Sequence, residues 1–141
     1  MKKLLLVFFI ASMTSSHVEC VMSEAQLKSA AKLLRNVCQP KTKISAAQLA
    51  TLQTGVVNQD EPEVMSYIEC ILRTGQIMKD AKLNIDSLKS QMANLPPTIS
   101  EPGMITVEHC KDSPKSSDKF IAAAEFYKCF YDDNPANFFF P

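Results

Sequence analysis

Cysteines restrict the folds open to this chain more than any other residue type. The sequence of 141 residues contains five of them, and four follow Cys20: Cys38, Cys70, Cys110 and Cys129. If the chain is secreted, this even number predicts two disulfides, although the spacing alone permits more than one pairing. Because none of the four belongs to a C-x-x-C pair, a zinc site is poorly supported and no metal is expected.

The first 20 residues have the layout of a secretory signal peptide. Lys2 and Lys3 precede an unbroken apolar run at residues 4–11, and small and polar residues follow that run. The apolar run is far shorter than the roughly 20 residues that a bilayer-spanning helix needs. We therefore expect secretion into the extracellular space and no stable insertion into a membrane.

Two cleavage positions fit this pattern, after Ser16 and after Cys20. The region of Cys20 is favoured, because the first amphipathic pattern starts at Ser23. Cleavage there removes residues 1–20 and leaves the four later cysteines to pair. Residues 21–141 are then expected to form a single helical ligand-binding domain that ends in a C-terminal tail at residues 135–141.

Charge and motif content exclude several function classes. Residues 1–20 carry Lys2, Lys3 and Glu19 of the 15 basic and 15 acidic residues, so residues 21–141 have a net charge of about −1. That balance gives no basic surface for nucleic acid. Only three glycines are present, and neither G-x-S-x-G nor H-E-x-x-H occurs. We expect no enzymatic activity, no catalytic residues and no cofactor.

Apolar residues recur at steps of three and four almost throughout residues 23–131, which predicts an all-α fold. Capping boxes open the first two helices at 23–26 and 45–48. Pro40 is expected to stop the first helix, and residues 76–83 are expected to form a connecting loop. The six predicted helices span 23–39, 45–55, 60–75, 84–95, 100–110 and 118–131.

With its cysteines placed on these helices, the chain resembles the insect odorant-binding proteins. That family has six cysteines in a fixed order, with three residues between the second and third and eight between the fifth and sixth. Ser66 stands at the second position and Phe120 at the fifth. The first, third, fourth and sixth positions are held by Cys38, Cys70, Cys110 and Cys129. The loss of one complete pair resembles the minus-C variants of the family.

The resemblance implies a fold, a disulfide pairing and a function. The fold is a compact six-helix bundle around an internal hydrophobic cavity, and the pairing is Cys38–Cys70 and Cys110–Cys129. The function is a secreted carrier that binds odorants, pheromones or similar small hydrophobic molecules. An olfactory receptor is a further candidate partner, and the protein is expected as a monomer or weak homodimer. The alternatives are a general lipid or metabolite carrier in a non-olfactory fluid, and a secreted interaction or defence protein.

The resemblance also indicates which side chains line the cavity, although each of them could instead be an ordinary core residue. Tyr127 could give its hydroxyl to the ligand or to a backbone group. The tail is expected to fold over the cavity as a lid or wall, the alternatives being the outside of the bundle or a protein contact. The expected ligand-binding residues are Ile68, Leu72, Ile77, Leu88, Met92, Met104, Val107, Tyr127, Phe130, Phe138 and Phe139.

Two further positions carry expectations of their own. His109 could act as a pH switch or be an ordinary solvated histidine, and it is the only histidine in residues 21–141. Ser66 and Phe120 should face each other, since the cysteines they replace would be bonded. Without that link, we expect an adjustable spacing between the third and sixth helices and a wider range of ligands.

Overall fold

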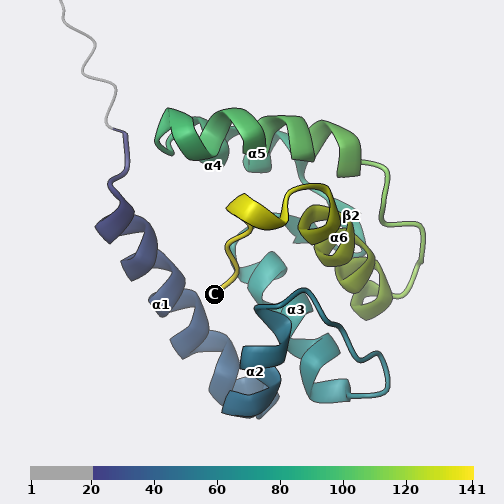
Figure 1. Ribbon diagram of the computed structural model, residues 1–141. Coiled ribbons are helices and arrows are strands. Elements are labelled where there is room, and N and C mark those ends of the chain that lie inside the picture. The colour runs from purple at the N-terminus through teal and green to yellow at the C-terminus, as the bar shows by residue number, and fades with distance from the viewer. Residues whose placement is uncertain (1–20) are drawn as a thin grey trace, which may run out of the picture.

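The computed structural model describes residues 21–141, so the expected signal peptide and Cys20 lie outside the described residues. Within this range the fold is all-α with six α-helices and two disulfides, as the sequence predicts (Figure 1). A two-residue hairpin and a short 3-10 helix complete it. The elements are α1 Glu24–Thr42, α2 Ala46–Leu52, α3 Pro62–Thr74, β1 Met78–Lys79, β2 Lys82–Leu83, α4 Ile85–Ala93, α5 Pro97–Cys110, α6 Lys119–Asp133 and η1 Pro135–Asn137.

Side chains next to the helices explain where several of them begin. Ser23 and Ser45 each form a complete capping box with the glutamine three residues later. Asn84 accepts a hydrogen bond from the Ser87 N–H at the start of α4. Asp118 accepts from two backbone N–H groups at the start of α6. These caps satisfy donors that a helix cannot satisfy internally, and so fix the helix ends locally.

The prediction that Pro40 stops the first helix is wrong. Pro40 lies inside α1, which continues to Thr42 and ends at Lys43 in a left-handed conformation, with φ of 60°. A proline removes one helical N–H donor. The turn after it is held by the Thr42 hydroxyl, which donates to the Cys38 carbonyl at 3.0 Å, and by the Lys43 N–H, which donates to Gln39.

The start of the fifth helix also differs from the prediction. The helix begins at Pro97 rather than near Ser100, and Pro102 lies inside it. Pro97 sits at the first turn, where a missing N–H costs nothing and the fixed φ suits a helix. Pro96 therefore ends the connection from α4, and α5 gains a turn.

A small antiparallel hairpin replaces the loop expected at residues 76–83. Met78 pairs with Leu83 and Lys79 with Lys82. The two residues between the strands, Asp80 and Ala81, have φ of 50° and 63°, as a tight two-residue hairpin turn requires. Strands of two residues are too short to show an alternating pattern, which is why the sequence gives no sign of them.

The central element is α3, of whose 13 residues eight are buried. It packs most extensively against α6 and α1, while α4 lies along α5. Figure 1 shows α4 and α5 together on one side of the molecule and α1 on another. The Met22 N–H donates to the Asn94 carbonyl at 2.8 Å, which ties the start of α1 to the end of α4.

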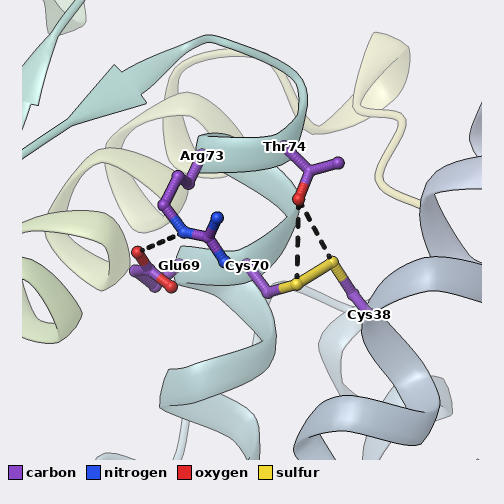
Figure 2. Close-up of polar contacts among 5 residues, drawn as sticks. All are labelled: Cys38, Glu69, Cys70, Arg73 and Thr74. Carbon is purple, nitrogen blue, oxygen red and sulfur yellow. Dashed lines mark hydrogen bonds and ion pairs between the residues drawn. A yellow bond between two sulfur atoms is a disulfide. The ribbon is translucent and has the colours of Figure 1, made fainter.

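Two disulfides join these helices. Cys38–Cys70 links α1 to α3, and Cys110–Cys129 links α5 to α6, which are the pairings that the resemblance implies. Figure 2 shows the Thr74 hydroxyl directed at the first bridge, 3.7 Å and 3.9 Å from its two sulfur atoms. In residues 21–141, no helix is both long enough and apolar enough to cross a membrane.

Candidate ligand-binding site

The C-terminal tail folds back into the helical arrangement (Figure 1). After η1 the backbone is extended at Phe138, so successive side chains alternate in direction. Phe138 and Phe140 are partly buried and pack against the hydrophobic core, whereas Phe139 is 48% exposed. The tail therefore packs against the bundle through Phe138 and Phe140 rather than through Phe138 and Phe139, and its role as a lid or wall of a cavity stays a prediction.

The two inward phenylalanines meet three tyrosines, and we call these five residues the aromatic cluster. Phe138 lies edge-on to Tyr127 and Tyr131, with ring centroids 5.2 Å and 5.0 Å apart. Phe140 lies edge-on to Tyr127 at 4.8 Å and to Tyr67 at 6.2 Å. Such edge-to-face pairs add about 0.5–1.5 kcal/mol each beyond the burial of their area. The tail is thus held by specific ring contacts.

The two buried tyrosine hydroxyls both donate to main-chain oxygen atoms. Tyr67 donates to Pro141 at 3.0 Å, which anchors the last residue of the chain. Tyr127 donates to the carbonyl of Leu52 at the end of α2. Of the two alternatives for Tyr127, the structure thus has the hydroxyl on a backbone partner.

Burial keeps both of these phenols neutral. It raises the pKa of Tyr127, and the nearby Tyr131 raises it further. Burial also raises the pKa of Tyr67, and this rise exceeds the opposing influence of the Arg35 guanidinium. Both hydroxyls therefore act as hydrogen-bond donors at neutral pH.

The structure brings most of the predicted lining residues into one apolar cluster. Of the predicted residues, the buried members of this cluster are Ile68, Leu72, Leu88, Val107 and Tyr127. Partly buried residues that pack against these are Ile77, Met92, Phe130 and Phe138. Met104 and Phe139 are not part of this cluster.

Three members of the aromatic cluster, Tyr67, Tyr131 and Phe140, are absent from the ligand-binding residues predicted from the sequence. Tyr67 follows Val64 by three residues and precedes Ile71 by four, so its place on the buried face of α3 could have been found. Phe140 could not, because the sequence does not say whether the odd or the even positions of the tail point inward.

Two glycines let side chains of this region come close to a neighbouring backbone. A Cβ at Gly103 of α5 would lie 2.9 Å from Met92 Sδ of α4. A Cβ at Gly55 would lie 2.2 Å from the ring of Tyr131. Both glycines are buried, and each provides room for a side chain of the site.

A polar clasp joins α5 to the last residue of α6, directly before η1. Buried Thr106 donates its hydroxyl hydrogen to Asp133 Oδ2 at 2.7 Å, and His109 Nδ1 lies 2.7 Å from Asp133 Oδ1. The Thr106 hydrogen bond, followed by that of His109, holds the pKa of Asp133 below its usual value. Asp133 therefore has a structural role, because it joins α5 to the end of α6.

The described residues offer no arrangement for metal binding, since no group of three His, Cys, Asp or Glu side chains within 21–141 could hold an ion. Two hollows of about 440 and 220 Å³ lie beside α6 and beside α2. Neither is lined by the predicted ligand-binding residues. The internal cavity therefore stays a prediction.

Comparison with known proteins agrees with the fold and the cysteine pattern. Residues 20–133 match the model of the PBP/GOBP family. General odorant-binding protein 72 of Anopheles gambiae is 32% identical over 122 residues, which cover 85% of this chain and 99% of that protein. General odorant-binding protein 19a of Drosophila melanogaster is 33% identical over 97 residues, covering 67% of this chain and 66% of the relative.

Solved structures show the same similarity. Odorant binding protein 4 of Chrysopa pallens superposes with a TM-score of 0.80 at 38% identity, covering 86% of this chain and all of that one. Odorant binding protein 5 of Apis mellifera gives a TM-score of 0.79 at 25% identity, covering 86% and 99%. The six helices, the two bridges and these matches together show that the chain belongs to the PBP/GOBP family of odorant-binding proteins.

Proposed function

We propose that the protein is a secreted carrier that binds small hydrophobic molecules, odorants or pheromones among them, where Phe138 and Phe140 now lie. The observation that carries this proposal is the aromatic cluster. The interior is completed by two rings from the last four residues of the chain, and these residues belong to no helix. Residues 138–141 are held by ring contacts and one hydrogen bond, so they can move away while the disulfide-linked helices stay in place, and an apolar ligand can replace them.

The energetics suit reversible binding. A ligand that buries a few hundred Å² of apolar surface gains about 25 cal/mol per Å², or several kcal/mol in all. Part of this gain offsets the cost of association and of displacing the tail rings. Affinities in the micromolar range, about −8 kcal/mol, are therefore attainable without a charged contact.

Tyr67 is the side chain best suited to orient such a ligand. Its hydroxyl bonds Pro141, so movement of the tail frees a buried donor for an alcohol, aldehyde or ester oxygen. Tyr127, in contrast, is committed to Leu52 of α2. We therefore assign the polar contact to Tyr67 and an apolar contact to the ring of Tyr127.

Binding of the fluorescent probe N-phenyl-1-naphthylamine tests this function, with unlabelled alcohols and esters as competitors. Phe138→Ala with Phe140→Ala should tighten probe binding at least about threefold, because displaced rings no longer compete, a gain of about 0.7 kcal/mol. Phe139→Ala is the matched control and should leave affinity unchanged, since Phe139 is 48% exposed. Absence of probe binding, or equal effects of both changes, would refute the proposal.

The absence of a cysteine pair at Ser66 and Phe120 supports a broad ligand range. With Ser66 on α3 and Phe120 in the first turn of α6, no disulfide joins these two positions. Ser66→Cys combined with Phe120→Cys should raise the melting temperature and narrow the set of competing ligands. If the bridge forms and neither quantity changes, this part of the proposal is wrong.

A carrier in a non-olfactory fluid would use the same site. The tissue in which the protein occurs therefore distinguishes that role from the transport of odorants. Secretion rests on the pattern of residues 1–20. Mass spectrometry of protein purified from native fluid would give both the mature N-terminus and the co-purifying molecule. Recovery of intact residues 1–20 would contradict secretion by signal cleavage. A receptor partner and a monomeric or weakly dimeric state belong to the same proposal.

A further inference from the structure

A hollow of about 440 Å³ lies beside α6, and none of the residues predicted to line the carrier site belongs to its lining. Its walls come from the α2–α3 connection, the α5–α6 loop and α6. The volume falls within the roughly 300–1,000 Å³ typical of small-molecule sites. Three separate segments thus build one concavity.

The loop wall of this hollow is fixed to α6. Glu125 Oε2 accepts hydrogen bonds from the backbone N–H groups of Lys115 at 2.7 Å and Ser116 at 3.1 Å. Hydrogen bonds to a carboxylate are stronger than those between neutral groups. These hydrogen bonds hold residues 115–116 beside α6. They also use the carboxylate of Glu125, which is the acidic side chain of the lining.

Two lysines bring positive charge to the hollow. Among the described residues, Lys115 has no carboxylate within ion-pair distance, whereas Lys128 pairs with Asp132 on its own helix. Ser113 forms part of the same wall, and its Oγ is buried with no hydrogen-bond partner in the described structure. A buried hydroxyl without a partner costs about 1–3 kcal/mol of stability. A ligand acceptor that bonds the Ser113 hydroxyl would remove this cost.

Apart from Gln59, the remaining lining is apolar. Val57 and the Cys129 half of a disulfide are partly buried and pack against the core, and Ala124 is 3% exposed. A ligand that fits must therefore present a negative group to Lys115 and Ser113 and an apolar portion to these three residues. Neither an ion alone nor a neutral apolar molecule uses both halves of the lining.

We propose that this hollow is a second binding site that takes a small monocarboxylate with a short alkyl chain. The carboxylate lies between the Lys115 ammonium and the Ser113 hydroxyl, which reaches it after a small movement of the loop. The chain lies against Val57 and Ala124. The site does not depend on the tail, so its occupancy is independent of the carrier site.

Titration of isotopically labelled, disulfide-bonded protein with hexanoate, followed by two-dimensional NMR, tests the site. Hexanoate should shift the backbone signals of Val57, Ser113, Lys115 and Ala124 in a saturable manner. Acetate carries the charge without the chain, and hexan-1-ol carries the chain without the charge. Both should bind these residues at least about fivefold more weakly, since each loses one half of the contacts.

Variants that each remove one charge test whether hexanoate binds in the hollow. Lys115→Gln should weaken hexanoate binding about threefold, and Lys79→Gln, the same change at a lysine that does not line the hollow, should not alter it. Glu125→Gln keeps an acceptor for the loop and removes a negative charge, so it should tighten binding about twofold. The spectrum of each variant without hexanoate reports whether that variant is folded.

Several outcomes would overturn the inference. These are hexanoate shifts that spare the hollow, equal binding of hexanoate and hexan-1-ol there, and identical titrations for Lys115→Gln and Lys79→Gln. Shifts confined to the aromatic cluster would support the carrier site while refuting this one. Shifts at the hollow that persist in the Phe138→Ala and Phe140→Ala variant would support this site whatever the fate of the carrier proposal.

Discussion

At the scale of single residues, the site depends on one contact in which a glycine has no acceptable replacement. Gly55 has φ of +75°, and its missing Cβ leaves room for the ring of Tyr131, which would otherwise be 2.2 Å away. Tyr131 in turn lies edge-on to Phe138. A backbone position after α2 therefore helps to determine where the tail packs.

We expect Gly55→Ala to destabilise the fold by about 2–4 kcal/mol, because a positive φ and a displaced ring both cost free energy. Urea denaturation measures this change. Gly75→Ala is the matched control, since φ at Gly75 is −74° and the nearest atom to an added Cβ is 3.2 Å away. It should cost less than about 1 kcal/mol. Equal losses in the two variants would contradict the role assigned to Gly55.

At the scale of elements, the polar clasp ties α5 to the end of α6, where the chain turns into η1 and the tail. Thr106 is buried, so its hydroxyl needs the partner that Asp133 provides. Because η1 contacts both α5 and α6, the clasp also sets the origin of the tail. We expect it to respond to pH.

Since folding lowers the pKa of Asp133 below 3.8, the clasp stabilises the fold above that pH, and its contribution is lost as the pH falls further. Asp133→Asn should therefore lower the urea midpoint at pH 7, and its difference from the wild type should shrink below about pH 3.8. Asp132→Asn, on the neighbouring surface carboxylate, controls for general acid effects. A difference between wild type and Asp133→Asn that stays constant from pH 7 to pH 3 would show that the negative charge of Asp133 contributes nothing to the clasp.

At the scale of the whole molecule, two disulfides restrain a small bundle whose core is packed in part by the C-terminal tail. One bridge spans 32 residues and the other 19. Together they fix α1 to α3 and α5 to α6, whereas α2, α4 and the tail are held to the bundle by packing and hydrogen bonds. The molecule thus divides into a covalently restrained frame and a more adjustable remainder.

Replacing Cys110 and Cys129 by alanine should lower the free energy of unfolding by about 3 kcal/mol, because the unfolded chain regains the entropy of an open loop. Replacing Cys38 and Cys70 should cost at least as much, since that loop is longer and both sulfurs are buried. Urea denaturation of each double variant gives the values. A loss below about 1 kcal/mol for either pair would mean that packing alone holds the frame.

Sequence alone determined what depends on neighbours along the chain. Ser23 and Ser45 cap their helices because the partners lie three residues away, and the apolar periodicity placed Ile68, Leu72 and Val107 in the interior. Resemblance supplied the cysteine pairing, which spacing left open. Even local rules failed at Pro40, where the Thr42 hydroxyl supports a further turn of α1.

Only the tertiary structure decided contacts between distant segments. Whether Phe139 or its two neighbours faces inward depends on how the tail meets Tyr67, Tyr127 and Tyr131. The Tyr127 hydroxyl bonds Leu52, 75 residues away, and no local pattern encodes that choice. Local hydrogen bonds and periodicity specify which elements form, whereas the free energy of burying one aromatic ring rather than another is defined only after those elements have packed together.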